Sequence, residues 1–268
     1  MNAKFLLVFA VTGSVWLSAC NSSTKHDENT TDTASVATND TTAVLTETAS
    51  LNKLTSEEES QGFKLLFDGQ STAGWHSYLK GDSVIGWKAE GGILVCPGNT
   101  GADLTSNDEY ENFELRFDWN VEPKGNSGVI YKVLEDKKYK STYESGPEYQ
   151  IIDDNGYPPY MENGKEIHIT DKQKSGANYD MQAPSAFKAK APGEWNEAVI
   201  IVNKNHVEHW LNGEKVVEYE YGGPEWKKQL AVSKFTKWPY ATPHAKGKIA
   251  FQDHEHKVEY RNIRIKIL

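Results

Sequence analysis

The chain has 268 residues, a formal net charge of −9 and no basic patch, which argues against nucleic acid as a partner. Its 8 Trp, 13 Tyr and 9 Phe are typical of a carbohydrate-binding surface, but equally of the core of a β-sandwich. Composition alone therefore leaves both an enzyme and a binding module open.

Residues 1–19 have the pattern of a secretory signal peptide. Lys4 supplies a positive start, and the apolar run that follows it is too short to span a membrane as a helix. Leu17-Ser18-Ala19-Cys20 resembles a bacterial lipobox, which implies cleavage before Cys20 and lipidation of that cysteine; an ordinary signal with a chance cysteine is the alternative. Asn21 after the cysteine implies, by the same resemblance, an anchor in the outer membrane.

Residues 20–58 are rich in Thr, Ser, Asn, Asp and Ala and carry almost no large apolar side chains. Such a segment buries too little surface to offset its ordering entropy, so we expect a disordered tether, with a binding tail as the alternative. Residues 59–268 show no repeat and no second boundary, which indicates one domain. If Cys20 carries lipid, Cys96 has no disulfide partner and is expected to be a small buried filler.

Strand patterns separated by turn residues run through the whole domain, and only residues 55–61 favour a helix. Residues 113–121 alternate apolar and polar side chains without a break. Asn212-Gly213 is a strong hairpin signal after residues 206–211. Further strands are expected at 199–202, 215–219, 247–252 and 258–267. We predict two packed antiparallel sheets, one of which bends so that its outer face forms a groove.

The stretch Gly-Pro-Glu-Tyr-Gln-Ile-Ile-Asp-Asp at 146–154 puts polar side chains on an otherwise apolar strand. Because strand side chains alternate, Glu148 and Gln150 face the same way. Asp153 faces the opposite way unless a bulge adds one residue and turns it back. Without a bulge, Asp153 is a turn residue.

Seven segments, in order, resemble the bacterial family of secreted 3-keto-glycoside (3-keto-disaccharide) hydrolases and lyases. They cover the domain from about residue 62 to the C-terminus: LFDGQSTAGWH, GWKAEGGILVC, NSGVIYK, GPEYQIIDD, SGANYDM, PGEWNEAVIIVNKNHVEHWLNG and GKIAFQDH…VEYRNIRIKIL. The resemblance implies an all-β, concanavalin A-like jelly-roll sandwich. It also implies cleavage of glycosides oxidised at C3, by elimination across C1 and C2 followed by hydration, with a divalent metal in some members.

Elimination needs a base, an acid near the glycosidic oxygen and a positive group for the enolate oxygen. Glu148 or Asp153 is the candidate base, and His254 the candidate acid or base. Lys132 or a metal is the candidate for the positive group that stabilises the enolate oxygen. The family commonly has Arg at the position of Lys132 and Gly at that of Glu255. These two departures leave the identity of the substrate open, but not the fold.

Substrate hydroxyls are expected to meet Gln150, Tyr179 and Asn126. Every candidate also has a structural alternative: a solvated strand face for Glu148 and Gln150, a turn for Asp153, core for Tyr179, a strand-entry bulge for Asn126, a strand end for Lys132 and a loop cap for His254. A Ca²⁺ ion held by Asp153 and Asp154 is conceivable, whereas the His pairs 254/256 and 206/209 have no third zinc ligand at a recognisable spacing.

The sequence leaves two other functions open. Glu148-x-Gln150-x-x-Asp153 has the spacing of the carboxylates of conventional glucanases, although Gln150 stands where a third carboxylate is expected. A lectin-like carbohydrate-binding module without turnover is the other, because it shares the expected fold.

Overall fold

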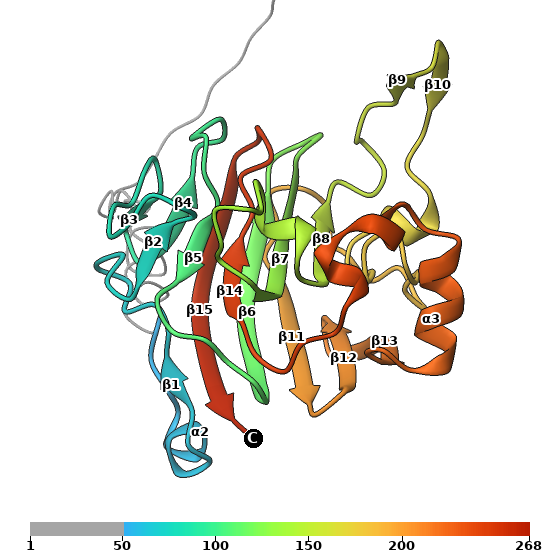
Figure 1. Cartoon of the computed structure of the whole chain (residues 1–268). Helices are drawn as coiled ribbons and strands as arrows, with labels where there is room; N and C mark the ends of the chain where they lie inside the picture. Colours follow the sequence, from blue (N-terminus) through green and yellow to red (C-terminus); the bar gives the residue numbers. More distant parts are fainter. Residues whose placement is uncertain (1–50) are drawn as a thin grey trace, which may run out of the picture. The chain divides into compact units, whose positions relative to one another are not determined.

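The computed structural model describes residues 51–268, which form a sandwich of two antiparallel sheets (Figure 1). The larger sheet has the order β13-β12-β11-β6-β15-β4-β3, with β1 also paired to β15. Its strands are β1 (Lys64–Leu65), β3 (Lys88–Glu90), β4 (Ile93–Cys96), β6 (Phe113–Val121), β11 (Asn196–Asn203), β12 (His206–Leu211), β13 (Glu214–Glu220) and β15 (Val258–Ile267). The expected all-β jelly-roll sandwich is confirmed.

The smaller sheet has the order β2-β5-β14-β7-β8. Its strands are β2 (Trp75–Ser77), β5 (Leu104–Ser106), β7 (Asn126–Val133), β8 (Glu148–Ile152) and β14 (Lys248–Phe251). A separate hairpin joins β9 (Tyr160–Glu162) to β10 (Lys165–Ile167). The short helical elements are α2 (Ser56–Ser60), η1 (Thr142–Glu144), η2 (Asp171–Gln173), α3 (Pro224–Ala231), η3 (Lys234–Lys237) and η4 (Pro239–Ala241).

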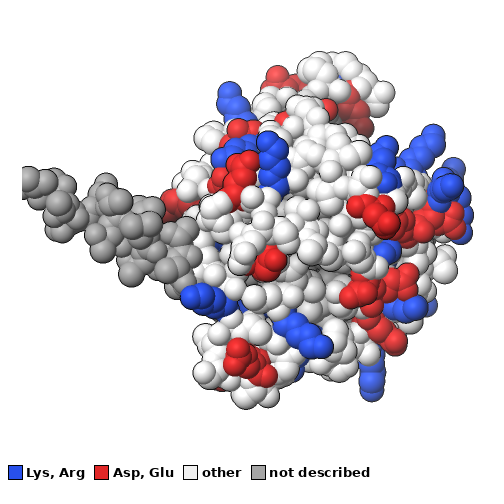
Figure 2. All heavy atoms as spheres, turned by 90° about the vertical axis from the view of Figure 1, so that its left-hand side faces the viewer, with Lys and Arg blue, Asp and Glu red and all other residues white. Residues whose placement is uncertain are grey.

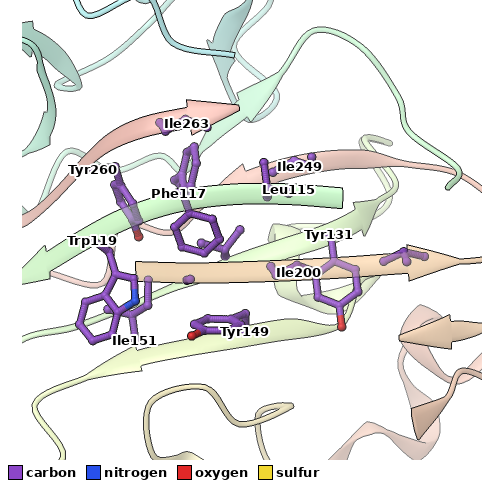
Figure 3. Close-up of a cluster of buried hydrophobic side chains, with 14 of the residues drawn as sticks. Leu115, Phe117, Trp119, Tyr131, Tyr149, Ile151, Ile200, Ile249, Tyr260 and Ile263 are labelled. Carbon is purple, nitrogen blue, oxygen red and sulfur yellow. The ribbon is translucent and has the colours of Figure 1, made fainter. Parts of the chain in front are cut away.

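Aromatic rings from both sheets meet between the layers (Figure 3). Phe117 of β6 lies 5.8 Å from the ring of Tyr149 on β8 and 6.2 Å from that of Phe251 on β14. Along β6, buried side chains alternate with half-buried ones, as the sequence predicts. Tyr149 therefore points into the core, which leaves its neighbours Glu148 and Gln150 on the outer face of the smaller sheet.

The expected C-terminal strands are confirmed as β11, β12, β13, β14 and β15. Asn212 and Gly213 take φ values of 50° and 82°, the left-handed conformation that a two-residue hairpin turn requires. Cys96 is completely buried, and burial raises the pKa of its thiol to about 12, as suits a filler rather than a nucleophile.

The folded region includes residues 51–58, which corrects the expected start of the domain at residue 59. Asn52 and Asn262 exchange backbone-to-side-chain hydrogen bonds of 2.8 and 2.9 Å. Thr55 begins α2 with a capping box, and buried Glu58 accepts from Arg264 Nε at 2.5 Å. These polar contacts dock a segment whose two large apolar side chains, Leu51 and Leu54, are half-buried. The expected signal peptide, lipidated Cys20 and remaining tether lie outside the described residues and stay predictions.

Basic and acidic side chains are intermixed on the face shown in Figure 2. This arrangement gives that face no single-sign field of the kind nucleic acid prefers. Within residues 51–268, no helix has both the length and the apolar character needed to cross a membrane.

A buried polar chain links the larger sheet to the loop that flanks β8. His209 Nδ1 lies 3.0 Å from Gly176 O, and since a carbonyl can only accept, Nδ1 carries the proton. His209 Nε2 then accepts from the hydroxyl of Tyr131 at 2.9 Å, and that hydroxyl accepts from Tyr219 at 2.7 Å. This arrangement requires a neutral imidazole, and burial lowers the pKa of His209 to about 4.

We predict that the protein loses stability as the pH falls from about 6.5 to about 4. In this window the unfolded chain binds a proton at His209 that the folded chain excludes, at about 1.4 kcal/mol per pH unit and about 3 kcal/mol in total. His209→Gln, which can still donate and accept, removes this part of the pH dependence in urea unfolding at pH 7 and pH 4.5. The exposed His168→Gln keeps it; equal slopes in wild type and His209→Gln contradict the assignment.

Candidate functional site

The outer face of the smaller sheet carries a cavity of about 380 Å³ above β7 and β8. Gln150 pairs with Gly128 and Glu148 with Ile130, in continuous register, so both polar side chains rise from the same face. The cavity is lined by Asn126, Tyr143, Glu148, Gln150, Tyr179, Lys234, Phe235, Trp238, Gln252 and His254. Five of the expected site residues therefore meet in one place: Glu148, Gln150, Asn126, Tyr179 and His254.

Glu148 is the one carboxylate among the described residues that line this cavity, and it is 8% exposed. Burial raises its pKa to about 8; the positive charge of Lys234 opposes this shift, and Asp103 and Asp180 add to it. A side chain at Gly128 would collide with the Glu148 carboxyl group, so the glycine in Asn-Ser-Gly makes room for it.

Amide groups surround Glu148 on the strand face. Gln150 and Asn126 lie with their side-chain amides 3.1 Å apart. When the nitrogen of Gln150 faces Glu148, it donates to Oε1 at 3.0 Å. These groups leave donors and acceptors beside the carboxyl, which suits recognition of sugar hydroxyls.

Lys234, on η3, supplies the positive charge of the cavity, and the sequence analysis missed it. Its Nζ lies 2.6 Å from Asp180 Oδ2, 3.3 Å from the hydroxyl of Tyr179 and 4.4 Å from the centre of that ring. Burial lowers the pKa of Lys234, but Tyr179 and Asp180 outweigh this and raise it, so the group is charged at neutral pH.

His254 follows β14 and lines the cavity, and one of its ring nitrogens is unpaired. Its Nδ1 and the Oε1 of Gln252 are buried and have no hydrogen-bond partner among residues 51–268. Buried polar atoms without partners are rare, and these two belong to side chains that line the cavity. His254 also lines a cavity of about 280 Å³ towards β5 and one of about 380 Å³ towards β9 and β10, so it stands where the three spaces meet.

Aromatic rings from short helical turns and their flanks line the same cavity as Glu148. The Trp238 ring lies 5.1 Å from that of Phe235 and 5.6 Å from that of Tyr143. Such rings suit the apolar faces of a sugar ring. The run Ser-Lys-Phe-Thr-Lys-Trp-Pro-Tyr at 233–240 has no strand or helix period, and its density of aromatic and basic residues is the only signal that points to it.

Asp153 does not join Glu148, which corrects the expectation that a bulge turns it into the groove. β8 ends at Ile152 without a register shift. The Asp153 carboxylate accepts from the backbone nitrogens of Lys124 at 2.8 Å and Gly156 at 2.8 Å, and shapes the turn that follows. Asp154 Oδ1 accepts from Ser175 N at 2.7 Å. These oxygens are already used, so the pair is a poor fit for Ca²⁺.

Lys132 also lies away from the cavity, which corrects its expected place beside the substrate. It takes a φ of 57° where the pairing of β7 with β14 shifts register, and this irregularity rotates its side chain. Its buried Nζ donates to the carbonyls of Glu111 and Ala245. Lys132 is a structural residue of this bulge.

One group of described residues could hold a metal ion, and it lies apart from the cavity lining. His206, Glu208 and Glu218, on β12 and β13, bring one ligand atom each within 4.8 Å of one another. Lys215 Nζ already binds Glu208 at 3.2 Å and Glu218 at 2.6 Å, so a cation there competes with it.

We predict that Glu148→Gln is more stable than wild type at pH 8 but not at pH 4. The raised pKa means that folded Glu148 holds a proton that the unfolded chain releases, so its stabilising contribution is full below pH 4.5 and is lost as the pH rises through about 8. The loss is about 4 kcal/mol, at about 1.4 kcal/mol per pH unit. Denaturant unfolding from pH 4 to 8 measures it.

The exposed Glu225→Gln is the matched control and keeps the wild-type pH dependence. A Glu148→Gln curve parallel to that of wild type would show that the carboxyl is not held neutral by the fold.

Comparison with known proteins identifies the family of this chain. A family model described as a 3-keto-alpha-glucoside-1,2-lyase-like domain matches residues 62–266. A 3-keto-disaccharide hydrolase of Bacteroides thetaiotaomicron is 33% identical over 242 residues, which cover 82% of this chain and 83% of the relative.

Two solved structures of candidate glycosyl hydrolases from Parabacteroides distasonis ATCC 8503 share the fold. One is 41% identical, with a TM-score of 0.77 over 81% of this chain and 99% of the other. The second is 27% identical, with a TM-score of 0.57 over 77% of this chain and 99% of the other. The family match covers far more than half of the sequence, and the chain therefore belongs to the family with a 3-keto-alpha-glucoside-1,2-lyase-like domain.

Proposed function

We propose that this protein cleaves the glycosidic bond of 3-keto-glycosides by elimination across C1 and C2 followed by hydration. A carbohydrate substrate is consistent with the family. The observation that carries the proposal is a single buried carboxyl group with a pKa of about 8 in a cavity that a lysine and a histidine also line.

Glu148 is the base in this proposal. A ketone at C3 acidifies the proton on C2, and a carboxylate whose pKa lies near the working pH is well matched to remove it. The electron pair of the C2–H bond first moves onto the C3 ketone to give an enolate. As the enolate reverts to the ketone, this pair forms the C1–C2 double bond and the bond from C1 to the leaving oxygen breaks. Water then adds to C1 and a proton returns to C2, which gives the free 3-keto sugar.

Lys234 and His254 serve the two oxygens that gain charge. The cationic Lys234 stabilises the enolate oxygen at C3, the role for which the sequence offers Lys132 or a metal. His254 donates a proton to the leaving oxygen and stands at the mouth of both side cavities, where a leaving group has room to lie.

Double displacement on unoxidised glycans is less well supported by this geometry. A retaining glycosidase needs two carboxyl groups about 5 to 5.5 Å apart. Among the described residues, the cavity holds Glu148 alone, and Asp153 is occupied by backbone amides in the turn. Elimination needs one carboxylate, which is what the cavity provides.

We predict that kcat/KM for a nitrophenyl 3-keto-glucoside rises about tenfold per pH unit and levels off near pH 8. Nitrophenolate leaves without a proton, so the profile reports the base alone. Glu148→Gln lowers kcat by at least about 100-fold at pH 8, where wild-type Glu148 is half ionised. Release of nitrophenolate, measured from pH 5 to 9, gives the profile.

The matching unoxidised nitrophenyl glucoside is the control and should not be cleaved. His254→Ala should retain nitrophenyl activity but lose turnover of an alkyl 3-keto-glucoside, whose leaving oxygen needs the proton. Full activity of Glu148→Gln, or equal cleavage of the unoxidised substrate, would reject the proposal.

A further inference from the structure

The β9–β10 hairpin extends away from both sheets (Figure 1), and within the described residues its two strands pair only with each other. Asn163 and Gly164 take φ values of 49° and 75°, which form the tight turn favoured by Asn-Gly. Tyr160 pairs with Ile167 and Glu162 with Lys165 in continuous register. The hairpin is thus regular, and alternate side chains along each strand point to its two opposite faces.

One face of this hairpin borders the second cavity of about 380 Å³, which joins the central one. Tyr160 and Glu162 line it, whereas Met161 between them does not and is 68% exposed. This is the alternation of a strand with one face turned towards the cavity. Tyr160 and Glu162 therefore share the face of β9 that borders the cavity, and Met161 lies on the other face.

The turn after β8 completes the wall of this side cavity. Tyr157 lines it, and its backbone nitrogen donates to Asp153 O at 3.0 Å, in the turn that the Asp153 carboxylate shapes. The cavity shares five liners with the central one: Asn126, Gln150, Tyr179, Lys234 and His254. A molecule can therefore extend from Glu148 past His254 to the hairpin.

We propose that this side cavity binds the leaving-group sugar of a disaccharide, with Tyr160 stacked on its ring and Glu162 accepting from its hydroxyls. The inference rests on the proposed function, because it assumes that the oxidised ring lies beside Glu148. Aromatic rings next to carboxylate and amide acceptors suit a pyranose, which has apolar faces and a polar edge. Glu148 does not line this cavity, as expected of a space for the group that leaves.

The other side cavity that His254 lines fits a sugar less well. It has a volume of about 280 Å³, and Lys80, Lys140, Asp103 and Asp253 are among its liners. Asp253 Oδ2 already accepts from Thr100 Oγ1 at 2.7 Å and Gly101 N at 2.9 Å. Fewer of its acceptors are free for a ligand.

The test compares two substrates that share the oxidised ring: a 3-keto-disaccharide and methyl 3-keto-glucoside, whose leaving group is too small to reach the hairpin. Tyr160→Ala should lower kcat/KM on the disaccharide by about 3- to 10-fold, mainly through KM, and leave the methyl glucoside unchanged. Tyr160→Phe should behave as wild type. The matched control Met161→Ala, on the opposite face of the same strand, should change neither substrate.

Equal losses on both substrates, or no loss on the disaccharide, would overturn this inference while wild-type turnover of both upholds the proposed function. A selective loss of disaccharide turnover in Lys140→Ala would place the leaving group in the cavity of about 280 Å³ that Lys140 lines and would overturn the inference as well. Failure of wild type to cleave either substrate would reject the proposed function and, with it, the subsite.

Discussion

The packing of Tyr149 between the two sheets fixes the position of the candidate site. Its ring lies 4.9 Å from that of His209 and 5.8 Å from that of Phe117, and its hydroxyl donates to Trp210 O at 3.1 Å. Because neighbouring side chains on a strand alternate, a Tyr149 held in the core requires Glu148 on the outer face. A slip of one residue would exchange the two, so core packing and site geometry are a single constraint.

The same arrangement explains why a stable sandwich carries a costly carboxyl group. Glu148 lies above Gly128, is almost completely buried and receives only partial compensation from Lys234. Burying a carboxylate costs free energy unless it is paired or takes up a proton. With a pKa near 8, Glu148 avoids this cost by staying protonated at neutral pH. The same pKa makes it a base that ionises close to neutral pH.

Local periodicity predicted part of this site, and tertiary detail decided the rest. Glu148 and Gln150 were assigned to one outer face because a period of two is independent of the partner strand. Lys132 was misplaced because a bulge with φ of 57° interrupts β7, and no pattern in the sequence marks it. The placement of Asp153 in the groove required a bulge, which the continuous pairing of β8 with β7 excludes. Lys234 lies on a 3₁₀ turn, whose sequence has no periodicity that could have indicated it. The fold was predictable because many strands show the same pattern, in which apolar and polar residues alternate between turn residues.

A direct titration of the Glu148 carboxyl group tests the central claim most simply. Infrared difference spectra between wild type and Glu148→Gln isolate its protonated C=O band across the pH range. We expect this band to persist through pH 7 and to disappear with a midpoint near 8. A midpoint near 4.5, the ordinary value for glutamate, would show that the buried carboxyl is ionised at neutral pH and would contradict the account.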